Sequence, residues 1–194
     1  AIANIDGMIF NAEGISLGDW RDQVKKNGTK TNLDEIINFV KETKPINPIF
    51  VDCTASYDLP ERYLDIFKAG MSIATPNKRA NSMSMDFYKK LRDTANEMHV
   101  RFLYETNVGA GLPIIDTLQN LFKSGDKLTG FNGIMSGSLS YIFGKLDEGK
   151  KFSEAVLEAK QLRYTEPDPR DDLKGTDVAR KALIIAREIG RAHV

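Results

Sequence analysis

The sequence predicts an α/β fold, in which part of a doubly wound parallel sheet is followed by part of an α+β domain. Apolar strand-like runs alternate with amphipathic helical runs over the first half of the chain, and polar or glycine residues follow several of the strand ends. Strands that alternate with helices in this way form a parallel sheet covered on both faces. Because crossover connections are right-handed, the doubly wound arrangement is the expected one.

Each expected element follows from the spacing of its apolar residues. Apolar and β-branched runs predict strands at residues 2–10, 49–53, 71–74 and 101–104. Apolar residues three and four apart predict helices at residues 19–26, 33–41, 59–69 and 83–98. Ligands of such sheets bind beyond the carboxyl ends of the strands, so we expect the ligand crevice where the later strands end.

A second part of the chain begins at Gly109, so that the expected domains are residues 1–108 and 109–194. Within the second part, the same spacing predicts a helix at 114–122, a strand at 128–135, and helices at 139–146 and 152–162. A last helix starts near Thr176, because apolar residues recur at helical spacing after it, and Gly190 ends it.

Composition excludes several classes of protein. The 194 residues are 41% hydrophobic and 28% charged, with zero formal net charge, which is ordinary for a globular protein and suggests no nucleic-acid partner. The sequence holds no apolar run near the ~20 residues that span a bilayer. One cysteine excludes an internal disulfide and fits a reducing cytoplasm, and two histidines leave little for a histidine-based or zinc site.

The most informative segment, residues 164–181, holds five carboxylates and four cations. Pro167 and Pro169 predict a rigid, extended loop before the last helix. The loop and the start of the helix bring charged residues into one small volume, where they suit a small zwitterionic substrate: Glu166, Asp171, Asp172, Asp177 and Lys181. Two alternatives are a simple surface bridge between Asp177 and Lys181, worth ~0.3–0.5 kcal/mol, and a metal site. The segment lacks the glycine and alternating spacing of a calcium loop, which disfavours the metal.

Three other features each have a plain structural interpretation. Lys78 follows an expected strand end, where it is either solvated or at the ligand crevice. Cys53 continues an apolar run without a cationic neighbour, which predicts a small buried core residue rather than a nucleophile. Gly109 and Gly111 lie between a strand and a helix but lack the third glycine of a dinucleotide fingerprint, so a structural turn is favoured.

Five motifs follow one another along nearly the whole chain: Phe50-Val51-Asp52-Cys53-Thr54, Thr75-Pro76-Asn77-Lys78, Asn107-Val108-Gly109-Ala110-Gly111-Leu112-Pro113, Ser136-Gly137-Ser138-Leu139-Ser140-Tyr141-Ile142-Phe143, and residues 164–181. In sequence and in order, these motifs resemble those of homoserine dehydrogenases. The chain looks most like the dehydrogenase half of the fused aspartokinase–homoserine dehydrogenases. It departs from the family at Arg163, where the family usually has glycine.

The resemblance implies reversible hydride transfer between NAD or NADP and aspartate 4-semialdehyde, which gives homoserine. Lys181 is implied to transfer the proton of the substrate oxygen, with Lys78 sharing that role or binding the substrate carboxylate. The implied substrate-binding residues are Glu166, Asp171, Asp172, Gly175, Thr176 and Asp177, with Glu166 and Asp172 nearest the substrate ammonium.

The resemblance also implies a cofactor site and a cation site. In a Rossmann-like domain, the cofactor contacts would be Thr54, Ala55, Ser56, Asn77 and Lys78. A monovalent cation, Na⁺ or K⁺, would be held by the backbone carbonyls of Glu105, Val108, Ala110 and Leu112. Carbonyl oxygens suit such hard cations.

The remaining expectations concern the whole protein. A glycine-rich G-x-G-x-x-G turn is not found in the sequence, so we expect an incomplete, inactive piece of a larger cytoplasmic enzyme, or of a plastid enzyme in a plant. The family implies a homodimer through the second domain, with residues 128–135 near the contact, and an aspartokinase domain in the same parent chain. The competing hypothesis is a non-catalytic module of the same fold that senses a nucleotide or an amino acid.

Overall fold

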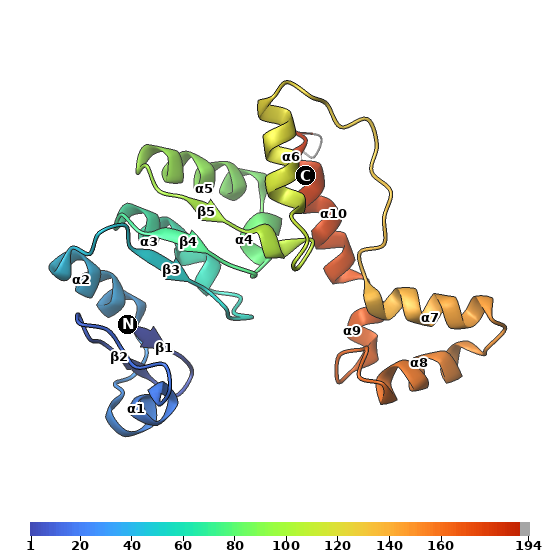
Figure 1. Cartoon of the computed structure of the whole chain (residues 1–194), viewed down its shortest axis with the longest axis horizontal. Helices are drawn as coiled ribbons and strands as arrows, with labels where there is room; N and C mark the ends of the chain where they lie inside the picture. The colour runs from blue at the N-terminus through green and yellow to red at the C-terminus, as the bar shows by residue number, and fades with distance from the viewer. Residues whose placement is uncertain (191–194) are drawn as a thin grey trace.

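The computed structural model describes residues 1–190, so the last four positions of the expected second domain lie outside the described residues. Its main sheet consists of three parallel strands in the order β3-β4-β5, Ile49–Val51, Ser72–Ala74 and Phe102–Leu103 (Figure 1). The register places Phe50, Ile73 and Phe102 side by side in one row across the sheet. The α/β class and the parallel sheet are therefore confirmed.

Three helices pack against the face of the sheet that carries this row. They are α2 (Leu33–Thr43), α3 (Tyr63–Lys68) and α5 (Met85–Glu97). Tyr63, Ile66 and Phe67 of α3 are completely buried in the resulting core. A 3₁₀ turn, η1 (Leu59–Arg62), leads into α3, and the short helix α4 (Arg79–Ser82) precedes α5.

The opposite face of the sheet is open within the described residues. Side chains alternate between the faces of a strand, so Ile49, Val51 and Leu103 point away from the helices. These three residues are 58%, 63% and 48% exposed. The expectation of a sheet covered on both faces is therefore wrong for this part of the chain, because α2, α3 and α5 all contribute to the core on one side.

The expected single strand at residues 2–10 is also wrong. Two short strands, β1 (Ile2–Ala3) and β2 (Met8–Ile9), pair antiparallel with each other and not with the parallel sheet. The chain reverses between them because the Asn4 side chain accepts hydrogen bonds from the backbone N–H groups of Asp6 (2.8 Å) and Gly7 (3.1 Å). Helix α1 (Trp20–Asn27) contacts this hairpin.

The second part of the chain is helical. Helices α6 (Ile114–Lys123) and α10 (Thr176–Glu188) share a second core with Tyr104 and Val108, next to the sheet. Helices α7 (Gly137–Asp147) and α8 (Phe152–Gln161) pack on each other, and α9 (Pro169–Leu173) lies beside α7 (Figure 1). The expected last helix, from Thr176 to just before Gly190, is confirmed.

Two expectations in the second part are wrong. Residues 128–135 form no strand but an irregular connection between α6 and α7, in which Phe131 and Ile134 are 46% and 80% exposed. Residues 169–173 form the short helix α9 rather than an extended loop. Pro169 occupies its first position, and the Asp168 carboxylate caps it by accepting a hydrogen bond from the N–H of Arg170 (3.0 Å).

Arg163 has the backbone conformation that glycine favours. Its φ is 59°, and it ends α8 in a Schellman motif, with hydrogen bonds from Arg163 N to Lys160 O (3.0 Å) and from Tyr164 N to Ala159 O (2.9 Å). A left-handed backbone costs a residue with a Cβ roughly 1–2 kcal/mol. This explains why glycine is the expected residue at this position.

We expect Arg163→Gly to raise the free energy of unfolding by about 1 kcal/mol. The relieved strain exceeds the added backbone entropy that glycine brings to the unfolded chain. Urea unfolding measures the change. The control is Lys160→Gly, at an exposed helical position of α8, which we expect to lower stability by about 1 kcal/mol. A less stable Arg163→Gly variant would contradict this account.

Among the described helices, none has both the length and the apolar composition that a membrane crossing requires.

Candidate active site

Strand β3 leads into a buried carboxylate. Asp52 is 1% exposed, and its two oxygens accept hydrogen bonds from the Tyr63 hydroxyl and from the backbone N–H of Thr54 (2.8 Å). The Asn77 amide lies 3.4 Å from the same carboxylate, and the Thr75 hydroxyl donates to the Asp52 carbonyl (2.9 Å). Burial, followed by the bond to Asp52, raises the pKa of Tyr63 well above its ordinary value. The hydroxyl therefore stays a donor, and the cluster holds the ends of β3 and β4 together.

The two loops predicted to hold the cofactor are joined by one side chain. The Asn77 amide donates to the carbonyl of Ser56 (3.0 Å), so the end of β4 is tied to the loop after β3. Within that loop, the Thr54 hydroxyl accepts from the N–H of Ser56 (3.1 Å), while Thr54 and Ala55 remain exposed. The structure thus brings Thr54, Ser56 and Asn77 together at the carboxyl edge of the sheet, next to Lys78.

Two lysines from different halves of the chain meet on one carboxylate. Lys78 Nζ lies 3.1 Å from one oxygen of Asp177, and Lys181 Nζ lies 2.9 Å from the other. Lys181 also donates to the carbonyl of Met135 (2.8 Å). The lysine side chains are 24% and 18% exposed, so this cluster is more than a solvated helix bridge.

Asp177 keeps its charge at neutral pH. Partial burial acts to raise its pKa, but the hydrogen bond from Lys181 and the attraction of Lys78 outweigh burial and leave the pKa below its ordinary value of 3.8. A carboxyl group with a lowered pKa stabilises the fold above its unfolded pKa. The stabilisation is lost as the pH falls through the lowered value, and both lysine bridges are then lost with it.

The acidic residues of the loop fall into a neighbouring group. Asp172 accepts hydrogen bonds from the Ser138 hydroxyl (2.7 Å) and from the backbone N–H of Glu166 (2.8 Å), which ties the loop to the start of α7. Asp171 pairs instead with exposed Lys174 (3.0 Å). Among the described residues, the Glu166 carboxylate has no hydrogen-bond or ion-pair partner and so is available to a ligand.

A single glycine connects this acidic group with the two lysines. Gly175 has a φ of 65°, which lets the chain turn directly from α9 into α10. Thr176 begins α10, and Asp177 follows in its first turn.

Asp168 faces Arg170 in the exposed part of the segment, where that guanidinium lowers the pKa of Asp168 to about 2.

The glycine loop, which contains Gly109 and Gly111 and precedes α6, is bound by the carboxylate of Glu105. Glu105, in the turn η2 (Glu105–Asn107), accepts hydrogen bonds from the N–H groups of Ile115 and Asp116, both 2.8 Å, at the start of α6. A phosphate would compete with this carboxylate, which supports a structural turn over a dinucleotide fingerprint. Gly109 is needed there, because a Cβ would lie 2.6 Å from the carbonyl oxygen of Leu112.

The four residues of the predicted cation site lie in this one loop. Val108 is buried, Ala110 has a left-handed φ of 51°, and Leu112 is 65% exposed. The Glu105 and Leu112 carbonyls each accept one backbone hydrogen bond, which leaves each a second lone pair. No cluster of three or more His, Cys, Asp or Glu that could hold a metal ion occurs in residues 1–190. Backbone carbonyls are a different kind of ligand, and the site remains a prediction.

Cys53 is exposed, and the prediction that it is a buried core residue is wrong. Strand β3 ends at Val51, and the buried position after it belongs to Asp52. The apolar run alone could not predict the burial of Asp52, because the three groups that bind its carboxylate are not recognisable from the local sequence.

Sequence reasoning also missed several residues of the site. They are Asp52, Tyr63, Ser138 and Met135, the last through its carbonyl. Ser136 gave a local signal, since it caps α7 by accepting a hydrogen bond from Leu139 N (3.2 Å). The other contacts join residues between 11 and 46 positions apart, which no local pattern predicts.

Comparisons with known proteins agree with this geometry. Residues 8–105 match the family model "Homoserine dehydrogenase, NAD binding domain", and residues 113–194 match the model "Homoserine dehydrogenase". A bifunctional aspartokinase/homoserine dehydrogenase of Haemophilus influenzae is 48% identical over 190 residues, which are 98% of this chain and 23% of that protein. A homoserine dehydrogenase of Schizosaccharomyces pombe is 41% identical, over all of this chain and 53% of that protein.

Solved structures show the same relationship. A hyperthermophilic archaeal homoserine dehydrogenase in complex with NADPH superimposes with a TM-score of 0.74 at 26% identity, over 96% of this chain and 58% of that one. A Candida auris protein described as of unknown function gives a TM-score of 0.83 at 40% identity, over 91% and 50% of the two chains.

The fold and the matched models define an α/β protein with the NAD-binding domain of a dehydrogenase family. The lysine–carboxylate cluster lies at the carboxyl edge of its parallel sheet, where such proteins bind their ligands. The chain belongs to the homoserine dehydrogenase family. It spans about a quarter of the length of the bifunctional relatives that it matches and about half of the Schizosaccharomyces pombe relative.

Proposed function

We propose that this chain provides the reaction site of an NAD(P)-dependent homoserine dehydrogenase. The enzyme interconverts L-aspartate 4-semialdehyde and L-homoserine, in the pathway to threonine, methionine and isoleucine. The observation that carries the proposal is the meeting of Lys78 and Lys181 on Asp177, at the carboxyl edge of the sheet and inside the matched family models.

The strand-end loops fit a dinucleotide. Thr54, Ala55 and Ser56 follow β3 at the sheet edge, where Thr54 and Ala55 are exposed, and Asn77 holds this loop against the end of β4. Lys78 lies directly beyond, so that it would adjoin the reacting ring. When bound, the nicotinamide supplies the hydride chemistry, and the surrounding protein supplies orientation and charge. The residues described fit either NAD or NADP.

Lys181 is the group that we assign to proton transfer. In the reduction, the aldehyde carbon gains a hydride and its oxygen gains a proton, which the Lys181 ammonium can give; in the oxidation the same nitrogen takes the proton back. Asp177 orients Lys181 through the 2.9 Å bridge and also holds Lys78, which either shares the transfer or binds the substrate carboxylate.

The acidic loop is suited to the ammonium group of the amino-acid substrate. The Glu166 carboxylate has no partner among the described residues, while Asp172 is fixed by Ser138 and by the Glu166 backbone. We assign binding of the substrate ammonium to Glu166 and Asp172, and we place Asp171 at the edge of the same substrate-binding group. Gly175 and Thr176 would line the path between this group and the lysines, because they connect α9 with α10.

A monovalent cation, Na⁺ or K⁺, is proposed at the glycine loop. The carbonyls of Glu105, Val108, Ala110 and Leu112 belong to one turn between β5 and α6, and the lone pairs left on the Glu105 and Leu112 carbonyls fit a hard cation. Such an ion would stabilise the loop that connects the two domains.

A direct assay tests the proposed function. The full-length protein is incubated with homoserine and NAD or NADP, and reduced nicotinamide is followed by its absorbance; the reverse direction uses aspartate 4-semialdehyde. Turnover in both directions supports the enzyme. Binding of a nucleotide or an amino acid without turnover would instead support the non-catalytic sensing module. The ratio of kcat/KM for NAD and NADP settles the cofactor preference.

The proposed partners follow from the relatives. Matched proteins of Haemophilus influenzae and Arabidopsis thaliana are named as fusions of aspartokinase with homoserine dehydrogenase, so we propose an aspartokinase domain in the same polypeptide. We propose a cytoplasmic location, or a plastid one if the source is a plant, since the Arabidopsis thaliana relative is named chloroplastic.

We expect the chain to self-associate as a two-fold dimer. The open sheet face with Ile49, Val51 and Leu103 is one apolar surface, and the connection with Phe131 and Ile134 is another. Exposed apolar faces and strand edges favour pairing with a second copy, and two-fold dimers are the commonest closed assemblies.

Light scattering at high micromolar concentration measures this association. Ile134→Asp is expected to weaken it, because residues 128–135 are predicted to lie near the contact. The control is Leu157→Asp on α8, which alters another exposed apolar residue, 56% exposed, away from that connection. A clean monomer for the unmodified chain would contradict the prediction.

A further inference from the structure

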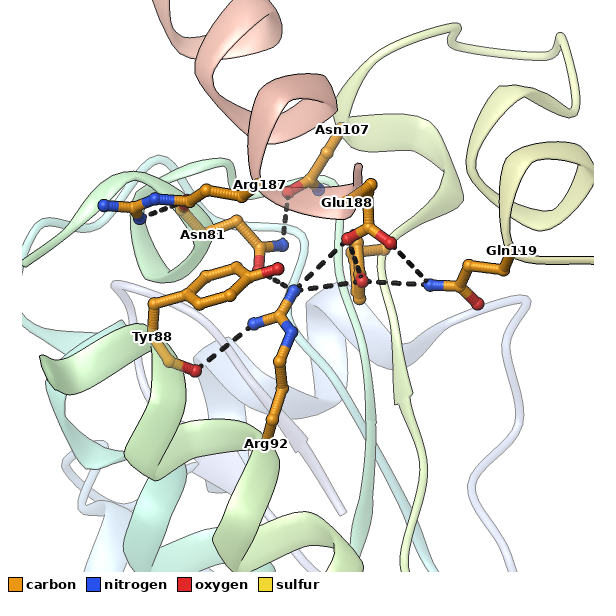
Figure 2. Close-up of polar contacts among 8 residues, drawn as sticks. Asn81, Tyr88, Arg92, Asn107, Gln119, Arg187 and Glu188 are labelled. Atoms are coloured by element: carbon orange, nitrogen blue, oxygen red, sulfur yellow. Dashed lines mark hydrogen bonds and ion pairs between the residues drawn. The ribbon is translucent and has the colours of Figure 1, made fainter. Parts of the chain in front are cut away.

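A network of polar side chains connects the two halves of the chain (Figure 2). Its members are Asn81, Tyr88, Arg92, Tyr104, Asn107, Gln119, Arg187 and Glu188. They come from α4, α5, the end of β5, η2, α6 and α10. The network lies at the carboxyl-terminal end of α10, whereas the lysine–carboxylate cluster lies at its beginning. None of its members belongs to the reaction site described above.

Glu188 is the acceptor at the centre of one half of the network. One of its oxygens accepts from the Tyr104 hydroxyl (2.5 Å) and lies 3.4 Å from the Arg92 guanidinium, and the other accepts from the Gln119 amide (3.0 Å). The Glu188 side chain is 7% exposed. Burial raises the pKa of Tyr104 well above its ordinary value, so its hydroxyl remains a donor to Glu188.

Arg187 forms the other half and binds α4 directly. Its Nη1 donates to the carbonyl of Asn81 (2.8 Å), and its Nη2 donates to the carbonyl of Met83 (2.7 Å). Arg187 is 5% exposed, and its guanidinium lies 4.9 Å from the centre of the Tyr88 ring. The last carbonyls of a helix lack partners within the helix, and Arg187 supplies them for α4. A planar guanidinium that binds two carbonyls fixes direction as well as distance.

The two helices joined by Arg187 are the same two that carry the reaction site. Lys78 is the residue before α4, and Asp177 lies in the first turn of α10. Asp177 and Arg187 are ten positions apart, which corresponds to about 15 Å of helix at 1.5 Å per residue. The apolar core that holds α10 through Ile184 and Ile185 is non-directional, so it constrains the axial position of α10 less than directional hydrogen bonds do. A slip of one turn, about 5.4 Å, would separate Lys78 from Asp177.

We propose that Arg187, supported by Glu188, is a positioning residue that fixes the axial register of α10 on α4. It thereby sets the distances among Lys78, Asp177 and Lys181. A buried charge is costly, and an apolar side chain of similar size would pack the same space without that cost. The arginine adds directional bonds to two carbonyls, that of Asn81 in α4 and that of Met83 directly after α4. The kinetic consequence rests on the proposed dehydrogenase function.

The test compares Arg187→Met and Arg187→Lys with the unmodified full-length protein. Methionine keeps much of the packing and removes both donors, while lysine keeps the charge and can reach one carbonyl at a time. We expect Arg187→Met to lower kcat about 10–100-fold, because a misplacement near 1 Å costs up to about 10²-fold in rate. NADPH affinity should change less than about three-fold, and Arg187→Lys should recover part of kcat. The matched control, Arg180→Met on the same helix, should retain kcat.

A purely structural role predicts a different pattern, in which Tm falls and kcat at a temperature well below Tm stays constant. A folded Arg187→Met variant with kcat within two-fold of the unmodified protein therefore overturns the proposal. If Arg187→Met does not fold, Arg187→Lys decides by the same criterion.

Crystal structures test the position of α10 independently of the proposed dehydrogenase activity. Even if the unmodified protein does not oxidise homoserine, the Lys78 Nζ to Asp177 Oδ1 separation in Arg187→Met still tests the register. We expect this separation to exceed the 3.1 Å of the unmodified protein by enough to break the ion pair. An unchanged separation overturns the proposal.

Discussion

Lys181→Ala in the full-length protein is expected to lower kcat by about 10²–10⁴-fold, with cofactor affinity nearly unchanged. The Lys181 side chain is 18% exposed and is held on both sides, by Asp177 at 2.9 Å and by the Met135 carbonyl at 2.8 Å. Alanine removes the main group that we assign to proton transfer and leaves the cofactor loops intact. Steady-state kinetics in both directions, with NADPH binding measured by calorimetry, give the two quantities.

The matched control is Lys174→Ala. Lys174 lies in the same segment but is 66% exposed and pairs with Asp171 at the surface, so its loss should leave kcat within about two-fold. A Lys181→Ala enzyme with near-normal kcat would contradict the assignment and transfer the role to Lys78. A variant that loses turnover and cofactor binding together would indicate general disruption of the site.

Asp52→Ala is expected to lower the free energy of unfolding by about 2–5 kcal/mol. The substitution leaves the Tyr63 hydroxyl and the Thr54 N–H without their acceptor, and an unsatisfied buried donor costs about 1–3 kcal/mol. It should also weaken NADPH binding, because the loop after β3 loses its anchor. Urea unfolding measures the first effect, and calorimetric titration of the full-length protein measures the second.

Two further variants sharpen this test. Tyr63→Phe added to Asp52→Ala removes one orphaned donor, so the double variant should be more stable than the sum of the two single changes predicts. Asp58→Ala, an exposed carboxylate whose side chain makes no capping bond at η1, is the matched control and should have little effect. A loss below 1 kcal/mol in Asp52→Ala would show that water replaces the carboxylate.

Local patterns in the sequence predicted the parallel strands, the long helices and the pairing of Asp177 with Lys181. The spacing of apolar residues fixes such elements within a few positions, and four residues separate the two members of that pair on one helix. The family resemblance assigned Lys78 and Lys181 to one site, but the contact between Lys78 and Asp177 was not predicted, since 99 positions of sequence separate them and no periodicity links them.

The predictions that failed needed information from distant residues. A strand at 128–135 requires a pairing partner, and its apolar pattern does not show whether one exists. Asp52, and not Cys53, is buried at the end of this strand because Tyr63 and Asn77 supply bonds to the carboxylate. The network around Arg187 and Glu188 depends in the same way on partners 69–106 positions away.

The exposure of Cys53 provides an experimental handle. It is the only cysteine in the sequence, and it lies one residue before Thr54, where the cofactor is proposed to bind. A thiol-reactive fluorophore would therefore label this chain at one defined position without prior mutagenesis. Its emission would respond when a dinucleotide fills the adjacent loop, so that binding could be followed in real time and separately from turnover.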